Sequence, residues 1–286
     1  MPRSKKEKPG PIKKMLQIVV PIILLIWLFI VVVFSYSTYP VQQSNMPKYV
    51  AYFNGYSTPP SYILSQTNIT INKSFTISFW MYPTRVGNGI PGSPYSEDMI
   101  DVSNNTGELP QIYLEWRGNG YFNLNICKLN GSYPANCSEE FRRENWTNQW
   151  VHVVETYNNG TFAVYANGKP IFYSNGTASG PGMIWRPAVG NLVISDAKVY
   201  ISYYIPYSAN AYDSEFAGYM SNVQIYGDAL SQSEVSTLYR SGMAGHPLSS
   251  EDLLGWWPLN GNANAFVPKA YDGVMFGNVS FVAPPK

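Results

Sequence analysis

Alternating side chains recur along this chain from about residue 48 and restrict that region to β-structure. In FTISFWMY, residues 75–82, the apolar side chains of Phe75, Ile77 and Phe79 are separated by Thr76 and Ser78. A two-residue period places successive side chains on opposite faces of a strand. The pattern returns in QIYLEW, YFNLNIC, AKVYISYYI and FAGYMSNVQIY, with turn clusters of Gly, Pro or Asn between them. About a dozen strands at this spacing predict a two-sheet antiparallel sandwich of the jelly-roll type.

The stretch QWVHVVETYNNGTFAVYANGK, residues 149–169, decides whether a histidine and a carboxylate can act together. His152 and Glu155 are three residues apart, which is one face of a helix but opposite faces of a strand. The β-branched and aromatic residues favour a strand, and Asn167-Gly168 is typical of a type I′ hairpin turn. We therefore predict that His152 is a structural histidine. The predicted strand places Trp150, His152, Val154 and Thr156 on one face and Val151, Val153, Glu155 and Tyr157 on the other.

One helix signal stands among the strand signals. In LSQSEVSTLYRSG, residues 230–242, Ser231 and Glu234 form an S-x-x-E capping box, and Gly242 follows as a stop. We see no internal boundary after residue 48, and a region of about 240 residues can be one all-β domain. The fold class expected is all-β, with one short helix.

An apolar run precedes the β region. Residues 15–34 contain no charged side chain, and twenty helical residues span about 30 Å, the thickness of a bilayer core. The basic segment ahead of the run predicts an amino terminus in the cytoplasm and the rest outside. A cleaved signal peptide and a pilin-type leader are the alternatives, but the run ends in bulky residues rather than a small-residue cleavage site. The organisation predicted is a cytoplasmic tail at 1–14, a single transmembrane anchor at 15–35, a stalk at 36–47 and one ectodomain at 48–286.

Two further features agree with an extracellular location. Cys127 and Cys137 are the only cysteines, and in an oxidising compartment such a close pair predicts a disulfide. The acceptors for N-linked glycans, N-x-S/T, all follow the apolar run, and most fall in predicted turns. They are Asn68, Asn72, Asn104, Asn130, Asn136, Asn145, Asn159, Asn175 and Asn278.

Charge is sparse and excludes one class of partner. Charged residues make up 13% of the chain, well below the usual quarter. No basic stripe lies outside the amino-terminal tail, so no nucleic-acid partner is predicted. A surface with few carboxylates loses little when the pH falls, which predicts an acidic medium, as on an acid-loving archaeon. The alternative is that a sugar-covered surface simply needs few charges.

Several stretches match a recurrent pattern of strands and turns. YVAYFNGYSTPPSYIL (49–64) has an opening strand with F-x-G, FTISFWMYPT (75–84) has F-T-I-S-x-W, residues 150–169 have W-x-H-V-x-x-T-Y and Y-x-N-G-K, and residues 216–242 have F-x-G-x-x-x-x-V-x-I-Y before a helix. In these stretches the chain resembles the laminin-G-like, concanavalin A-like jelly-roll family, in the form common in bacterial and archaeal surface proteins. The resemblance covers most of residues 48–245 and implies a concanavalin A-like sandwich. The stretch LLGWWPLNGNANAF (253–266) resembles an element that usually precedes such a domain; here it either adds the last strands or is left from a lost second copy.

The chain departs from this family pattern at positions that bear on a metal. The resemblance implies that acidic residues at these positions often hold a calcium ion. Calcium usually requires carboxylates among its oxygen ligands, which amides and a methyl group cannot supply, so calcium is disfavoured and no cofactor is predicted. The positions in question are Asn54, Ser221, Asn222, Asn260 and Ala265.

A remaining acidic group lies in YSEDMIDVS, which contains Glu97, Asp98 and Asp101. We interpret this stretch as a solvated loop, with a cation at Asp98 and Asp101 as the alternative. Glycosidases of related fold carry carboxylates on one face of a single strand, as in E-x-D-x-x-E, and this spacing does not occur here. G-x-S-x-G, H-E-x-x-H and phosphate-loop motifs do not occur either. We therefore predict that the protein is not an enzyme.

The sequence and the resemblance together predict a membrane-anchored extracellular binding or adhesion protein that displays a glycosylated, lectin-like domain. Its partners would be the membrane and either carbohydrate or another surface protein. A self-associating subunit of a coat or filament is the alternative, and a glycosidase of the same fold is less favoured. Sugar C–H faces stack on aromatic rings, although any one ring can instead pack in the core. The ring candidates are Trp116, Trp146, Trp185, Tyr203, Tyr204 and Tyr207.

Overall fold

The computed structural model describes residues 19–20, 45–55, 57, 59–85, 96–104, 111–117, 122–127, 139–141, 146–159, 161–174, 192–203, 215–248, 251–266 and 272–286. The chain divides into two compact units, Met1–Gln43 and Ser44–Lys286. Only Val19 and Val20, which are helical, are described in the first unit. The predicted anchor at 15–35 therefore lies almost wholly outside the described residues. Within the part of the chain that the structure describes, no helix has the length and apolar character needed to cross a membrane.

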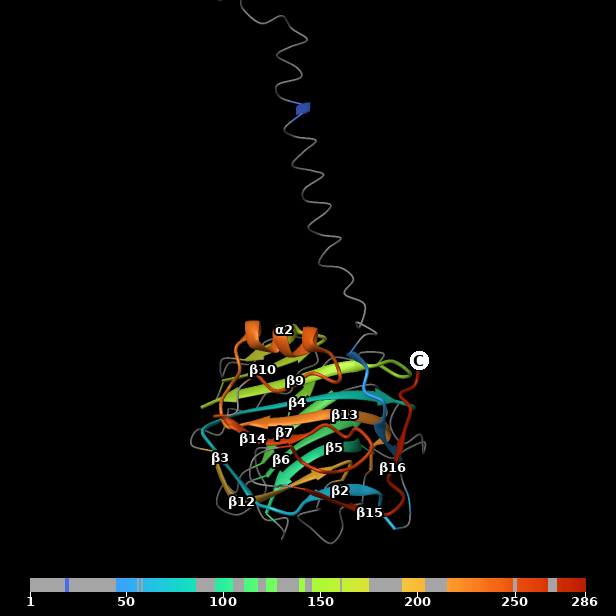
Figure 1. Cartoon of the computed structure of the whole chain (residues 1–286). Helices are drawn as coiled ribbons and strands as arrows, with labels where there is room; N and C mark the ends of the chain where they lie inside the picture. The colour runs from blue at the N-terminus through green and yellow to red at the C-terminus, as the bar shows by residue number, and fades with distance from the viewer. Residues whose placement is uncertain are drawn as a thin grey trace, which may run out of the picture. The chain divides into compact units, whose positions relative to one another are not determined.

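The second unit is an antiparallel β-sandwich of two sheets (Figure 1). In the first sheet, β4 (Ser74–Pro83) lies between β9 (Val151–Asn158) and β13 (Ala217–Tyr226). On its other side, β13 pairs with β1 (Val50–Asn54) and β14 (Leu253–Trp257). The strands of this sheet, in spatial order, are β11 (Lys169–Ser174), β10 (Thr161–Ala166), β9 (Val151–Asn158), β4 (Ser74–Pro83), β13 (Ala217–Tyr226), and then β14 (Leu253–Trp257) beside β1 (Val50–Asn54), which pairs with β16 (Ser280–Val282).

The second sheet packs against the first. Its strands in spatial order are β15 (Gly273–Phe276), β2 (Tyr62–Ser65), β12 (Val193–Ile201), β5 (Ser96–Ser103), β6 (Gln111–Arg117), β7 (Phe122–Cys127) and β8 (Glu139–Phe141). The short strand β3 (Ile69–Asn72) pairs with the first half of β12 and reaches β4 through Asn72 and Ser74, so it joins the two sheets at one end. The predicted all-β, two-sheet sandwich is confirmed.

The alternation in β4 explains how the core forms. Phe75, Ile77 and Phe79 are fully buried and belong to one apolar cluster between the sheets. On β9, Val151 and Val153 join the same cluster, while Val154 packs on the opposite side. The predicted assignment of faces on these strands is therefore confirmed. Each apolar side chain of this size stabilises the fold by about 1.5–3 kcal/mol when it is buried between the sheets.

Helix α2 (Gln232–Ser241) covers the outer face of the first sheet above β9 and β10 (Figure 1). Ser231 is its N-cap, the side chains of Ser231 and Glu234 make the predicted capping box, and Gly242 ends the helix with a φ of 78°. Val235 packs against the sheet, and Tyr239 stacks on Trp80. The helix predicted from the sequence is confirmed in both position and termini.

Two boundary questions are decided by contacts. The stretch 253–266 adds a strand, β14, to the sandwich through pairing with β13, so the first of its two interpretations holds. Residues 45–47, predicted as the end of a stalk, belong instead to the sandwich unit: Asn45 Nδ2 donates to the Ser241 carbonyl at 2.8 Å, and its own carbonyl accepts from Ala244 N–H at 2.9 Å. The second unit thus begins a few residues before the expected boundary at residue 48, because the side-chain amide and the carbonyl of Asn45 both find partners after α2.

Candidate functional site

The histidine in the first sheet is structural. His152 is buried beneath α2, where its Nε2 lies 3.0 Å from Ser78 Oγ and its ring packs against Trp80 and Tyr239. Burial lowers the pKa of His152 to about 3, so the ring is neutral at physiological pH. Glu155 lies on the opposite face, in the core, as the strand period requires. The two groups cannot act on one substrate.

The predicted ring candidates divide into three groups. Trp116 is fully buried, Trp146 is nearly so, and the two rings stack with centroids 5.5 Å apart. The prediction that these two rings are exposed and stack on sugars is wrong, because both pack in the core between the sheets. Tyr203 is partly exposed and stacks on Tyr62. The remaining candidates, Trp185, Tyr204 and Tyr207, lie outside the described residues.

The acidic stretch is not a solvated loop. It forms β5, whose pairing with β6 shifts register between Asp98 and Ile100. Asp98 lies opposite Glu115 and Asp101 opposite Tyr113, so the extra residue of this bulge brings two carboxylates that are three apart to one face. Both are buried, and Asp101 accepts from Gln111 Nε2 at 2.8 Å. This face carries an enclosed polar layer rather than an open acidic cleft.

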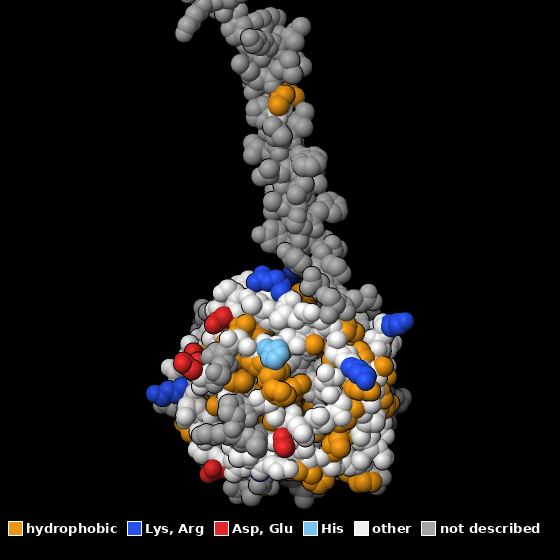
Figure 2. Space-filling view, viewed as in Figure 1, with side chains coloured by type: hydrophobic (Ala, Val, Ile, Leu, Met, Phe, Trp, Pro, Cys, Tyr) orange, Lys and Arg blue, Asp and Glu red, His pale blue; other side chains and the backbone are white. Residues whose placement is uncertain are grey.

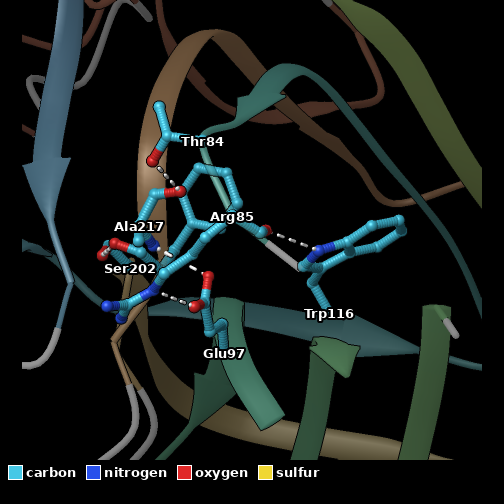
Figure 3. A network of polar contacts seen from close by, with 7 residues as sticks. Thr84, Arg85, Glu97, Trp116, Ser202 and Ala217 are labelled. Carbon is cyan, nitrogen blue, oxygen red and sulfur yellow. Dashed lines mark hydrogen bonds and ion pairs between the residues drawn. The ribbon is translucent and has the colours of Figure 1, made fainter. Parts of the chain in front are cut away.

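Glu97 has a separate structural role at one end of the sandwich (Figure 3). Its carboxylate accepts a hydrogen bond from Arg85 Nε at 2.6 Å and another from the Ala217 N–H at 3.0 Å. Burial raises the pKa of Glu97 to about 7, although both hydrogen bonds and the guanidinium charge lower it. The side chain thus ties β5 of one sheet to β13 of the other. Among the described residues, no three His, Cys, Asp or Glu side chains come together to hold a metal ion.

A pocket of about 180 Å³ opens beside β14, between residues that are far apart in the sequence. Its floor is Trp256, against which the rings of His246 and Phe266 lie tilted at centroid distances of 5.0 and 5.2 Å. Phe266 is 70% exposed, the largest value among the exposed large hydrophobic side chains of the described residues. We call this the Trp256 pocket. It is lined by Trp256, Phe266, His246, Pro258, Asn222 and Asn260, among others.

Asn222 is fixed in the wall of the Trp256 pocket by a buried polar network. It lies at a bulge of β13 with a φ of 53°, a left-handed conformation that Asn tolerates better than most residues. Its Oδ1 accepts from Trp256 Nε1 at 2.7 Å and from Gln224 Nε2 at 2.9 Å, and its Nδ2 donates to the Gly245 carbonyl at 2.9 Å. Gln224 is in turn held by the Tyr226 hydroxyl. Such a satisfied network holds one geometry.

The same contacts test the calcium question. Asn222 and Asn260 line the pocket, and Ala265 is packed against the core nearby, whereas Asn54 lies at the end of β1. The Asn222 Oδ1 that would have to face a cation instead accepts two N–H groups, and Asn260 Oδ1 accepts the Tyr49 N–H at 2.9 Å. Oxygens committed to N–H donors, in a described pocket lining that contains no carboxylate, do not fit calcium.

The described lining of the Trp256 pocket contains no Asp, Glu, Lys or Arg. Figure 2 shows the exposed histidine, in pale blue, bordered by hydrophobic side chains on this face. Aromatic faces with fixed amides and no formal charge suit an uncharged ligand with both C–H faces and hydroxyl groups. The volume is below the roughly 300–1,000 Å³ of clefts for drug-sized molecules, which suits a single ring.

Sequence reasoning missed this pocket although it marked two of its amides. In the sequence, Asn222 and Asn260 stand out only as positions where the family pattern has an acid. Trp256 and Phe266 lie within the stretch 253–266, for which the sequence allows two interpretations. The available signal was the coincidence of these departures with a Trp-rich strand, but the side chains meet only through pairing of β13 with β14.

Comparison with protein-family models finds a match to Laminin_G_3, the concanavalin A-like lectin/glucanases superfamily, over residues 57–236. The chain belongs to this superfamily. The match covers well over half of the chain and ends inside α2, so the Trp256 pocket, built largely from residues beyond 236, lies mostly outside the family match. The resemblance inferred from the sequence is confirmed.

Solved structures share the fold. A native heptameric SAP-like pentraxin from Limulus polyphemus matches at a TM-score of 0.55 and 16% identity, covering 83% of this chain and 95% of its own. A protein from Bacteroides ovatus, provisionally named a carbohydrate binding protein, matches at a TM-score of 0.54 and 16% identity, covering 83% of this chain and 60% of its own. At such identity the likeness shows the fold alone. A search of curated proteins found no match.

Proposed function

We propose that this protein binds carbohydrate, and that the Trp256 pocket takes one uncharged sugar ring. The observation that carries the proposal is the combination of Trp256 and Phe266 with the fixed amides of Asn222 and Asn260 in a pocket of about 180 Å³. The exposed ring of Phe266 offers a face for sugar C–H groups, and the Nδ2 group of the exposed Asn260 can donate to a hydroxyl, while the Asn222 network holds the wall of the pocket in place. Membership of a superfamily of lectins and glucanases supports the same ligand class.

The proposal includes the setting of the domain. The chain would be held by a membrane anchor at 15–35 and would display residues 44–286 outside the cell, where the predicted glycans and the predicted Cys127–Cys137 disulfide would form. Exposure of Asn68, Asn72 and Asn159 is compatible with glycosylation. Asn104 is half-buried, so a glycan there would have to attach to the part of its side chain that is exposed. The remaining positions lie outside the described residues: Cys137, Asn130, Asn136, Asn145 and Asn175. Binding to another surface protein or to a second copy is the competing use of the same face.

Removal of the exposed ring tests the pocket. The full chain should retain neutral saccharides on a glycan array. Phe266→Ala should weaken binding of the tightest of these by roughly fivefold in calorimetric titration, since an aromatic stacking contact contributes on the order of 1 kcal/mol. Phe266 is largely exposed, so its loss should leave the melting temperature unchanged. Binding should also survive a chelator, because the pocket does not fit calcium.

A matched control is Val193→Ala. This change removes an exposed apolar side chain where β12 pairs with β3, and it should not change the affinity for saccharide. An array with no retained saccharide, together with concentration-dependent assembly in light scattering, would favour the coat or filament subunit instead. An equal loss of saccharide affinity from both substitutions would mean that the sugar does not bind in the Trp256 pocket.

A further inference from the structure

The segment FGNVS, residues 276–280, combines a glycan acceptor with an exposed aromatic ring. Asn278 is followed by Val279 and Ser280, which completes the acceptor motif, and Phe276 stands two residues before it. Phe276 ends β15 and is 39% exposed; Asn278 is exposed in the turn that leads to β16. The ring and the acceptor amide therefore lie on one short turn at the surface.

This turn is held in a fixed conformation. Gly277 has a φ of 63°, and a Cβ added there would lie 2.3 Å from the Pro60 carbonyl oxygen, so the position requires glycine. The Asn278 N–H donates to Ser61 Oγ at 2.9 Å. Ser61 is buried, and its own N–H donates to the Glu215 carboxylate at 2.9 Å. The acceptor is thus presented by a rigid backbone.

The ring of Phe276 is also fixed. It stacks on Tyr62 with centroids 4.6 Å apart and planes 10° from parallel, and Tyr62 stacks on Tyr203 with the same centroid distance. We call Phe276, Tyr62 and Tyr203 the aromatic stack. An aromatic face carries partial negative charge and attracts polarised C–H groups. Because the stack already immobilises Phe276, packing a sugar on its exposed side loses little side-chain entropy.

We propose that Asn278 carries an N-linked glycan whose first sugar packs against Phe276, so that the glycan stabilises the edge of the sandwich at β15 and β16. In its formation, Asn278 Nδ2 bonds to the anomeric carbon of a lipid-diphosphate-linked oligosaccharide. The lipid diphosphate leaves with the bonding electron pair, and one amide proton passes to the transferring enzyme or to solvent. The inference requires the outward placement given under the proposed function, but not sugar binding by the Trp256 pocket.

A second acceptor provides an internal control. Asn159 lies in the turn between β9 and β10, and it also has an aromatic residue, Tyr157, two positions before it. Tyr157 is only 1% exposed and stacks on Phe75 in the core. Tyr157 therefore offers no exposed face to a glycan on Asn159, and we expect that removal of this glycan does not alter stability.

The test is a thermal double-mutant cycle on the full chain produced in cells that N-glycosylate. Asn278→Gln and, independently, Ser280→Ala should each lower the melting temperature by about 2–4 °C, the shift that one aromatic contact produces in a domain of this size. In a Phe276→Leu background the same two changes should have almost no effect. Asn159→Gln should be silent in both backgrounds. Equal losses in both backgrounds, or no loss at all, overturn the inference.

Two direct readouts accompany the cycle. Glycopeptide mass spectrometry should find Asn278 occupied, and an unoccupied Asn278 beside an occupied Asn159 overturns the inference. Proton resonances of the first sugar should shift upfield in the ring current of Phe276 and return on Phe276→Leu; unshifted resonances overturn it as well. If no acceptor carries a glycan, both this inference and the outward placement fail, whereas retention of saccharide by the Trp256 pocket is judged separately on the array.

Discussion

Glu155 is a carboxyl group in the apolar core. Its strand neighbours are Ile77 on β4 and Val164 on β10, both fully buried. Among the described residues, neither oxygen of Glu155 has a hydrogen-bond partner. Burial raises the pKa of Glu155 well above its ordinary value of 4.5, so the group is held neutral in the fold. A neutral carboxyl costs far less to bury than a charged one.

Replacing Glu155 with an apolar residue should make the fold less sensitive to alkaline pH. Above about pH 4.5 the unfolded chain loses the Glu155 proton while the folded chain keeps it, so the native protein loses stability as the pH rises. Glu155→Leu removes this dependence and should raise the free energy of unfolding in urea more at pH 8 than at pH 4. An equal change at both pH values would show that Glu155 does not titrate as its burial requires.

The elements show which local signals specify structure. Asn167 and Gly168 have φ values of 51° and 73°, as a type I′ turn requires, and the hairpin of β10 and β11 follows from them. The bulge in β5 has no comparable signal in the sequence. The register shift in β5 depends on which residues of β6 pair with it. Turn chemistry is local, whereas strand register is decided by the partner strand.

The contribution of the N-cap of α2 to the free energy of unfolding should be measurable. Ser231 N–H donates to Glu234 Oε2 at 2.7 Å, and the Ser231 side chain accepts from the Glu234 N–H. Ser231→Ala should lower the free energy of unfolding by about 1 kcal/mol. Gln232→Ala, at the exposed first position of the helix, is the control and should cost much less. Similar losses from both substitutions would mean that the cap is not formed in solution.

At the scale of the whole molecule, three buried groups among the described residues, Glu97, Glu155 and His152, change the stability with pH in opposite directions. Glu97 and Glu155 have raised pKa values, so their contributions grow as the pH falls toward 4.5. His152 has a lowered pKa, so its contribution is present above pH 6.5 and is lost as the pH falls toward about 3. Of these three groups, the two carboxyls outweigh the histidine between pH 7 and 4.5. Below pH 4.5 the histidine still lowers the stability, and so does Glu234, whose pKa is lowered by the hydrogen bonds from Ser231.

The full chain should therefore be most stable at mildly acidic pH, between about 4.5 and 6.5. Unfolding by urea measured at intervals from pH 3 to pH 8 gives the profile directly. Glu155→Gln should move the maximum toward neutral pH, since it removes one of the two opposing carboxyls. A stability that climbs steadily from pH 4.5 to 7 in the native chain would refute the balance. A maximum on the acid side would agree with the acidic medium expected from the sparse charge.

The sequence by itself determined what depends on neighbours along the chain. The alternation in 75–82 and 149–157, the Asn167-Gly168 turn, the cap at Ser231 and the family stretches together gave the strands, the helix and the superfamily. Period and turn chemistry act over a few residues, so they can be read without a fold. His152 was assigned correctly for the same reason, because a strand separates it from Glu155.

Only the tertiary structure decided what depends on register and packing. Trp116 and Trp146 are no different in sequence from exposed tryptophans, but opposing sheets bury them together. Asp98 and Asp101 share a face because β6 imposes a bulge. The Trp256 pocket and the aromatic stack each join segments separated by tens to hundreds of residues. Such contacts arise from the pairing of distant strands, which no local period specifies.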